Sequence, residues 1–157
     1  MTLFLFIAGC PEPIVYQQDS IQPPDIKHMV KIVDDAHRQG SFWIDAFEYP
    51  NIPNQRPLAN ASFDQAKQAC ADSGKRLCTA QEWRRACTGS ANKRFGYGDT
   101  YERERCHTAS SLDSGHTSMM QAQEFLVDSG SKQYCQTDGV FDLIGNLEEW
   151  VLDDWQG

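Results

Sequence analysis

Two helix-start signals separated by a glycine constrain the middle of this chain more than any other feature of its sequence. Ser62 and Gln65 form the first capping box, in which each side chain satisfies a free backbone N–H group at the start of a helix. Thr79 and Glu82 form the second capping box. Gly74 lies between them, at the left-handed position that commonly follows a helix. The sequence therefore predicts two short helices joined by a short extended link.

The second predicted helix has an apolar face, which carries Trp83, Ala86 and Cys87. The basic pair at positions 84–85 falls on the side that should face water. A tryptophan offers a large apolar area for packing. We therefore expect Trp83, and likewise Trp150, to be core anchors rather than substrate contacts.

Regular structure is predicted to be sparse outside the two helices. Residues 42–49 alternate in a pattern rich in β-forming side chains, which predicts a strand ending at the turn of Pro50 and Asn51. Residues 29–33 suggest a further strand, and residues 90–138 are rich in Gly, Ser and Asp. With 157 residues and 40% hydrophobic content, the chain suits one domain plus a tail. We expect a loop-rich α+β domain.

The formal net charge of -8 argues against nucleic acid as a partner. Proteins that bind a phosphate backbone gather Lys and Arg on one face, whereas the basic pairs in this sequence are isolated.

The N-terminal residues 1–10 predict a lipoprotein-type signal segment. An apolar run directly precedes I-A-G-C, which has the pattern of a bacterial lipoprotein cleavage box ending at Cys10. Cys10 would become the lipidated N-terminus, and the proline-containing residues 11–40 would tether the lipid to a domain at residues 41–157. This pattern predicts an extracytoplasmic protein, lipid-anchored at the bacterial periplasm or outer membrane. A buried N-terminal strand and an ordinary cleaved signal are the alternatives.

Five cysteines follow Cys10, and none of them forms the C-x-x-C pair of a zinc or redox site. Disulfides are the simpler account, and an odd number leaves at least one of the five without a partner among them. We expect Cys106 and Cys135 to bridge, because they flank a segment that is otherwise costly to order. A buried free thiol is the alternative for Cys87.

Three blocks of sequence, in order, resemble one known family. They are F-W-I-D-A-F-E-Y-P-N at 42–51, G-K-R-L-C-T-A-Q-E-W at 74–83 and F-D-L-I-G-N-L-E-E-W at 141–150. They are similar to F-x-I-D-x-x-E-V-T-N, G-K-R-L-P-T-E-A-E-W and G-L-Y-D-M-x-G-N-V-W-E-W of the formylglycine-generating, sulfatase-modifying domain family. The resemblance implies a loop-rich variant of the C-type-lectin fold. In full, such a protein oxidises a cysteine of a partner sulfatase to formylglycine.

The resemblance covers only the first half of that domain, about residues 41–157. Family members normally continue into an R-G-G-S-W strand and close on G-F-R, and neither string occurs here, so we expect a truncated chain. The two cysteines that activate oxygen lie in the other half. No catalytic residue is therefore assigned, and copper is expected only where that half supplies the cysteine pair. The resemblance also implies that Cys70 and Cys87 bridge to that half.

A calcium site is the best candidate for bound chemistry in these residues. Asp142 and Glu149 flank a tight turn that contains Gly145, and calcium takes six to eight oxygen ligands from carboxylates and carbonyls. From the residues alone, the favoured alternative is that the two acids merely cap the turn. The resemblance implies a structural calcium held by the side chains of Asp142 and Glu149 and the carbonyls of Gly145 and Leu147.

Two functional hypotheses follow. The first is an exported, lipid-anchored member of the family that in full length acts on a sulfatase or another exported protein. The second is a non-catalytic, calcium-stabilised surface adaptor or binding lipoprotein, because a lectin-like fold supports many functions in its loops. A carbohydrate-binding lectin is less favoured, because neither E-P-N nor Q-P-D occurs in the sequence.

Overall fold

The computed structural model describes residues 9–11, 27–33, 40–108 and 125–152, and of residues 9–11 it describes the backbone alone. Short strands and short helices make up the regular structure in these ranges. The strands are β1 (Gly9–Pro11), β2 (Met29–Ile32), β3 (Phe42–Asp45), β4 (Lys75–Leu77), β5 (Gln136–Thr137) and β6 (Val140–Phe141), and the helices are α1 (Phe63–Asp72) and α2 (Ala80–Thr88).

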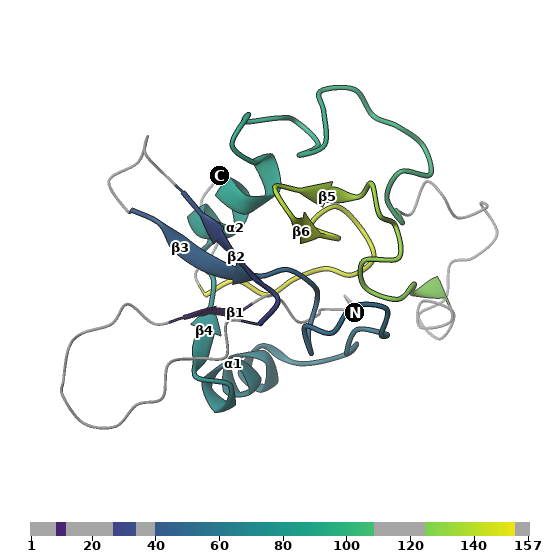
Figure 1. Cartoon of the computed structure of the whole chain (residues 1–157). Coiled ribbons are helices and arrows are strands. Elements are labelled where there is room, and N and C mark those ends of the chain that lie inside the picture. The colour runs from purple at the N-terminus through teal and green to yellow at the C-terminus, as the bar shows by residue number, and fades with distance from the viewer. Residues whose placement is uncertain (1–8, 12–26, 34–39, 109–124, 153–157) are drawn as a thin grey trace.

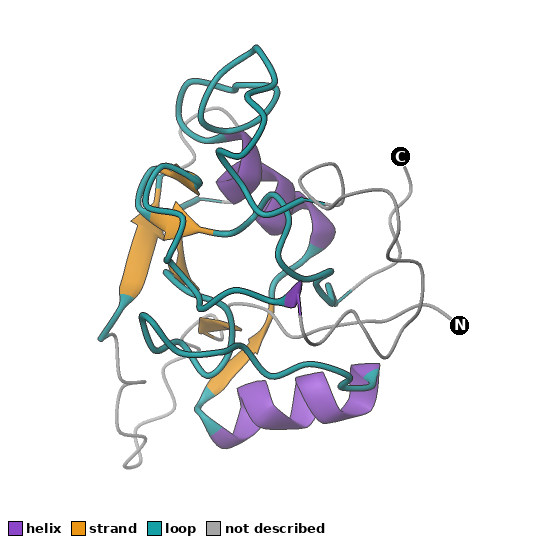
Figure 2. Ribbon diagram, turned by 90° about the vertical axis from the view of Figure 1, so that its right-hand side faces the viewer, coloured by secondary structure: helices purple, strands orange, loops and turns teal. Residues whose placement is uncertain are grey.

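The described strands form three antiparallel pairs, β1 with β4, β2 with β3 and β5 with β6. Figures 1 and 2 show α1 beside β4 at one end of the molecule and α2 toward the other end, near β5. Long loops connect these elements. The predicted mixture of α and β structure with few regular elements is confirmed, while the lectin-like arrangement stays a prediction.

Both capping boxes form as the sequence predicted. Ser62 Oγ accepts from the Gln65 N–H at 3.3 Å, and Gln65 Oε1 accepts from the Ser62 N–H at 2.8 Å. The same exchange joins Thr79 and Glu82, at 3.2 and 2.8 Å. Gly74, with φ 67°, follows α1 in the left-handed region that favours glycine. Local sequence therefore sets where each helix begins and where α1 gives way to β4.

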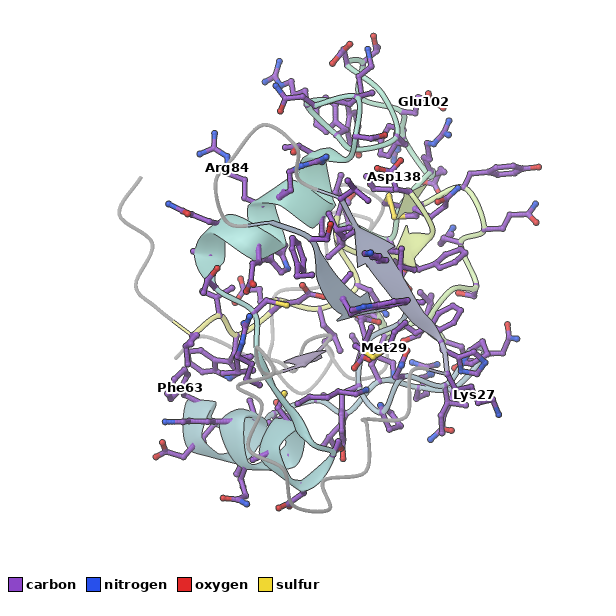
Figure 3. The ribbon with its side chains drawn as sticks, turned by 60° about the vertical axis from the view of Figure 1, so that its left-hand side comes forward. Lys27, Met29, Phe63, Arg84, Glu102 and Asp138 are labelled. Atoms are coloured by element: carbon purple, nitrogen blue, oxygen red, sulfur yellow. A yellow bond between two sulfur atoms is a disulfide. The ribbon has the colours of Figure 1, made fainter. Side chains whose placement is uncertain are left out.

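The apolar face of α2 is also as predicted, since Ala86 is buried and both Trp83 and Cys87 pack against the same core cluster. Arg84 is exposed and points away from the molecule in Figure 3. Arg85 differs from its prediction. It is half-buried, and its Nη2 donates to the carbonyl of Val33 at 2.9 Å, because the end of β2 lies against this side of the helix.

The strand predicted at residues 42–49 is shorter than expected, because β3 ends at Asp45. In a continuous strand, residues 45 and 48 would point to opposite faces. The chain instead bends, and the side chains of Asp45 and Glu48 are both buried, each residue with 2% of its surface exposed. Asn51 holds the bend, because its Oδ1 accepts from the Phe47 N–H at 3.2 Å and its own N–H donates to the Glu48 carbonyl at 2.8 Å.

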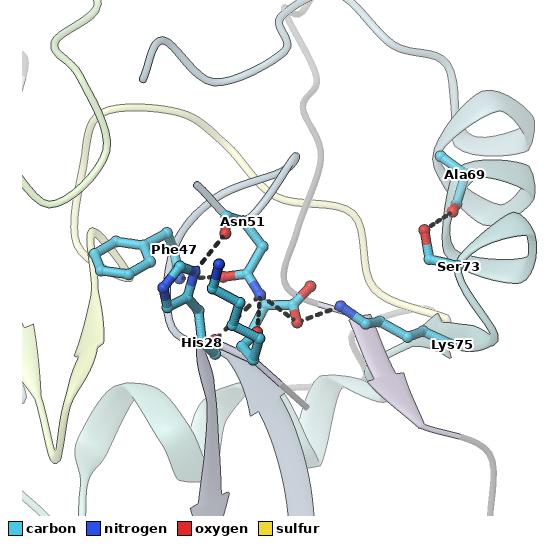
Figure 4. Close-up of polar contacts among 8 residues, drawn as sticks. His28, Phe47, Asn51, Ala69, Ser73 and Lys75 are labelled. Carbon is cyan, nitrogen blue, oxygen red and sulfur yellow. Dashed lines mark hydrogen bonds and ion pairs between the residues drawn. The ribbon is translucent and has the colours of Figure 1, made fainter. Parts of the chain in front are cut away.

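Asp45 is part of a buried ion pair that links β3 to β4. Lys75 Nζ lies 2.6 Å from Asp45 Oδ1, and Asn51 Nδ2 donates to the same oxygen at 2.9 Å (Figure 4). A buried charge is tolerated when it is paired and hydrogen-bonded in this way. This ion pair holds α1 and β4 against the β2–β3 pair.

The described residues form two core clusters of buried side chains. One contains Ile44, Ala86 and Val140, with Trp83 packed against it. The other lies under α1 and includes Ala66 and Leu77, with Trp150 packed against it. Both tryptophans thus contact the core, as expected from their apolar area.

Candidate metal centre

The turn that follows β6 has three residues in the left-handed region, Asp142 (φ 60°), Gly145 (φ 97°) and Asn146 (φ 54°). A Cβ atom at Gly145 would collide with the carbonyl oxygen of His107. The N–H of Asn146 donates to that same carbonyl at 2.7 Å. The turn therefore packs tightly on the segment at His107, which is why the position requires glycine.

Asp142 is buried, with 1% of its surface exposed. Its Oδ2 accepts from the Gly130 N–H at 2.7 Å, whereas its Oδ1 is buried without a hydrogen-bond partner among the described residues. Burial raises the pKa of the Asp142 carboxyl to about 6, and the hydrogen bond from Gly130 offsets only part of that rise. The Oδ1 atom of Asp142, a predicted ligand, is therefore available to bind a cation.

Glu149, the second predicted side-chain ligand, accepts a hydrogen bond from the indole N–H of Trp83. Burial raises its pKa well above the usual value, and the negative charges of Glu48 and Asp142 add to the rise. The α2 capping box sets the position of Trp83, so local helix signals also place this contact.

Glu48 is a third buried acid at this place. Its Oε2 accepts from Ser129 Oγ at 2.8 Å and from Asn146 Nδ2 at 2.7 Å, while its Oε1 is buried without a partner among the described residues. Burial, followed by the charge of Asp142, raises the pKa of Glu48 to about 8. Sequence reasoning missed this residue as a site residue. The sequence feature that could have pointed to Glu48 is its position as a second acid, three residues after Asp45, within the strand predicted at residues 42–49.

These three acids, Glu48, Asp142 and Glu149, are called the acid cluster below. A buried carboxylate without a counter-charge costs free energy unless it is protonated or binds a cation. Two carboxylate oxygens of the cluster have no hydrogen-bond partner, and hard cations such as calcium bind such oxygens. The unpartnered oxygen of Asp142, a predicted ligand, therefore has the chemistry that a hard cation such as calcium binds.

Among the described residues, no group of three or more His, Cys, Asp or Glu side chains is arranged to hold a metal ion together. The ligand set expected from the sequence uses only two such side chains, Asp142 and Glu149, and takes its remaining protein oxygens from the carbonyls of Gly145 and Leu147. That set stays a prediction. An open surface cavity of about 500 Å³ adjoins the turn and is lined by residues that include Trp83, His107 and Gly145.

The predicted bridge between Cys106 and Cys135 is confirmed, with a Cα–Cα distance of 4.9 Å. The carbonyl of Cys135 accepts from the Asp142 N–H at 3.1 Å. The disulfide thus fixes a segment in direct contact with the acid cluster.

Cys70 and Cys87 are free thiols, and Cys78 is disulfide-bonded. Burial raises the pKa of Cys70 and of Cys87 to about 11 in each case, and the nearby charges of Asp45 and Glu149, respectively, add to the rise. The reactive form of a cysteine is the thiolate, which is scarce at neutral pH when the pKa is so high. These two thiols are therefore poor nucleophiles as they stand. Their predicted bridges to a second half of the domain stay predictions.

The N-terminal predictions fall mostly outside the described residues, which include neither 1–8 nor 12–26. The backbone of Cys10 lies in β1, in register with Arg76 of β4. Its side chain lies outside the described part of the chain, so lipidation stays a prediction. No helix within the described residues is long and apolar enough to cross a membrane.

Comparison with known families gives one match. Residues 25–157 match the model of the sulfatase-modifying factor enzyme 1-like domain. No curated protein and no solved structure matches the chain significantly.

Proposed function

The chain belongs to the sulfatase-modifying factor enzyme 1-like domain family, and we propose that it forms the calcium-stabilised part of an exported protein that oxidises a cysteine of a partner sulfatase to formylglycine. We further propose that this part has the C-type-lectin-like fold variant that its motifs resemble. The observation that carries the calcium proposal is the acid cluster, three carboxyls with raised pKa in which the predicted ligand Asp142 has a buried oxygen without a partner among the described residues.

Calcium would be held by the side chains of Asp142 and Glu149 and by the carbonyls of Gly145 and Leu147. It would supply the positive charge that offsets mutual repulsion in the acid cluster. A ligand that binds only the folded state stabilises it by mass action, so calcium should raise the melting temperature.

The test is thermal unfolding of the full chain after chelation and at increasing calcium concentration. We expect a rise in melting temperature for the wild type and none for Asp142→Asn or Glu149→Gln. Glu102→Gln is the control, because this exposed acid lies in an ion pair with Arg105 outside the acid cluster. The site is refuted if calcium leaves the melting temperature of the wild type unchanged, or if Glu149→Gln keeps the full rise in melting temperature.

The oxidation step is assigned to residues other than the described thiols. Burial raises the pKa of both Cys70 and Cys87 to about 11, which suits packing rather than oxygen activation. Copper would therefore require a cysteine pair other than these two thiols. The same observation favours the second candidate function, a non-catalytic, calcium-stabilised surface adaptor. Aldehyde labelling of a cysteine-containing sulfatase peptide after incubation with the full-length protein separates the two, because only the oxidase produces the aldehyde.

Export and lipid anchoring at Cys10 complete the proposal. The disulfide between Cys106 and Cys135 supports an oxidising compartment. Cleavage before Cys10 would remove Gly9, whose backbone pairs with Leu77 in the β1–β4 pair. The mass of the N-terminal peptide of the mature protein is therefore the test, and a peptide that retains Gly9 or carries no lipid on Cys10 rules out the anchor.

A further inference from the structure

We infer that Glu48 is a positioning residue of the calcium site, one that fixes the turn of carbonyl ligands without itself being a ligand. This inference rests on the proposed calcium function. It connects an acid in the bend after β3 to a turn that lies 98 residues further along the chain.

The argument begins with the turn itself. The two predicted carbonyl ligands, those of Gly145 and Leu147, flank Asn146, so the orientation of Asn146 decides where both carbonyls point. Gly145 and Asn146 both have positive φ, a conformation that glycine adopts freely and asparagine less often, so contacts of the Asn146 side chain help to hold the turn.

The side chain of Asn146 is held on both sides. Its Oδ1 accepts from the Val127 N–H at 3.0 Å, and its Nδ2 donates to the Val127 carbonyl at 3.1 Å. The same Nδ2 donates to Glu48 Oε2 at 2.7 Å, which is the shortest of the three contacts. Glu48 therefore contacts the turn at Asn146, the residue between the two predicted carbonyl ligands.

Glu48 is in turn fixed from outside the turn. Ser129 Oγ donates to its Oε2 at 2.8 Å, and the bend that carries Glu48 is closed by the hydrogen bond between its own carbonyl and the Asn51 N–H. Residues that orient metal ligands through hydrogen bonds typically change metal affinity about 10- to 100-fold when mutated. The contacts of Glu48 place it in that role.

Two substitutions separate position from charge. Glu48→Gln keeps the length of the side chain and an oxygen that can accept from Asn146, but it loses the negative charge. Glu48→Asp keeps the charge but shortens the reach toward the turn by one methylene. If Glu48 acts by position, Gln retains calcium affinity close to that of the wild type and Asp weakens it about 10- to 100-fold. If Glu48 acts only by charge, the order of the two variants reverses.

The measurement is the dissociation constant for calcium, by calorimetric titration of the chelator-treated full chain, with terbium luminescence as a second probe. Asp45→Asn is the matched control, because Asp45 is equally buried in the same segment and bonds Lys75 and Asn51 rather than the turn. It should lower the melting temperature and leave the dissociation constant unchanged.

Each outcome decides the inference. Tight binding by Glu48→Gln with weak binding by Glu48→Asp supports it. Unchanged affinity in both variants, or the reversed order, overturns it while the calcium site stands, provided that Asp142→Asn abolishes binding. A wild-type chain that binds no calcium overturns both the proposed function and this inference.

Discussion

Asp45 and Glu48 lie three residues apart and are equally buried, yet their surroundings have opposite electrostatics. Asp45 lies 2.6 Å from the ammonium group of Lys75. Glu48 has Asp142 as a charged neighbour, and among the described residues it forms no ion pair with a basic side chain. The charge of the Asp45 carboxylate is compensated by Lys75, whereas that of the Glu48 carboxylate is repelled by Asp142.

The difference teaches how to separate a structural acid from a ligand-binding one. A buried carboxylate with a lysine beside it is already compensated and has no need of a further cation. A group of buried carboxylates that receives only N–H and O–H donors requires protons or a metal ion. Burial alone therefore does not indicate a site, whereas burial without a counter-charge does.

The largest expected effect comes from removing the counter-charge of Asp45. Lys75→Met leaves the Asp45 carboxylate buried without its ion pair, and breaking such a pair from one side costs about 3 to 5 kcal/mol. We expect a loss near the lower end of that range, because Asn51 still donates to Asp45. Urea unfolding of the full chain in calcium measures it.

Lys93→Met is the control for this substitution. Lys93 Nζ lies 2.7 Å from Asp99 Oδ2, which is close to the 2.6 Å of the buried pair, but this pair is exposed. Exposed pairs contribute little to stability, so the control should unfold like the wild type. Equal losses in the two variants would mean that Asp45 does not depend on Lys75, and the contrast with Glu48 would collapse.

The next effect is the pH dependence of the acid cluster without calcium. The folded-state pKa of Glu48 is raised to about 8 and that of Asp142 to about 6. At these two groups the folded protein then binds more protons than the unfolded chain, so their contribution to stability is fully present below about pH 4 and is lost as pH rises through these values. Asp142 alone accounts for about 3 kcal/mol, at about 1.4 kcal/mol for each pKa unit.

Unfolding free energies measured between pH 4 and pH 8, with chelator and with saturating calcium, check this expectation. Calcium should reduce the loss of stability between pH 4 and pH 8, because the cation favours the ionised carboxylates. Glu48→Gln should flatten the upper part of the range in chelator. Stability that instead rises with pH in chelator would show that the acid cluster is already compensated, as Asp45 is.

Sequence patterns predicted the parts of this structure that depend on local interactions. The capping boxes at Ser62 and Thr79, the left-handed Gly74 and the apolar face of α2 all follow from residues within one or two turns of each other. Asp142 and Glu149 flank one short turn, and the family resemblance rather than local pattern assigned them to calcium.

What the sequence did not reveal is long-range. Glu48 reaches Asn146 across 98 positions, and the bend after Asp45 that makes this contact replaces a strand expected to continue to residue 49. A strand that continued to residue 49 would have put Asp45 and Glu48 on opposite faces, whereas the bend buries both side chains. Arg85 was likewise predicted to face water. A helical pattern gives no information about its contact with the carbonyl of Val33, which lies 52 positions away in the chain.

The smallest expected effects distinguish the two tryptophans. Trp83 donates its indole N–H to the Glu149 carboxylate, in the acid cluster, whereas Trp150 donates to the neutral carbonyl of Ala61 at 3.0 Å, beside α1. Phenylalanine keeps most of the apolar area of each side chain and removes the donor. A hydrogen bond to a charged group contributes about 1.5 to 3 kcal/mol and one between neutral groups about 0.5 to 1.5 kcal/mol. In saturating calcium, where Glu149 is ionised, Trp83→Phe should therefore cost more stability than Trp150→Phe.

Calcium sharpens this last comparison, because only one of the two acceptors belongs to the proposed site. Calcium favours the ionised form of Glu149, whose pKa is raised well above the usual value without the cation, and a charged acceptor makes a stronger hydrogen bond, so the cost of Trp83→Phe should grow on adding calcium. The cost of Trp150→Phe should not change, since Ala61 lies in the cluster under α1. Urea unfolding of both variants with and without calcium measures these differences. If calcium changes both costs equally, the cation stabilises the whole fold rather than acting at Glu149. The electrostatic contrast between the two regions would then not identify the calcium site.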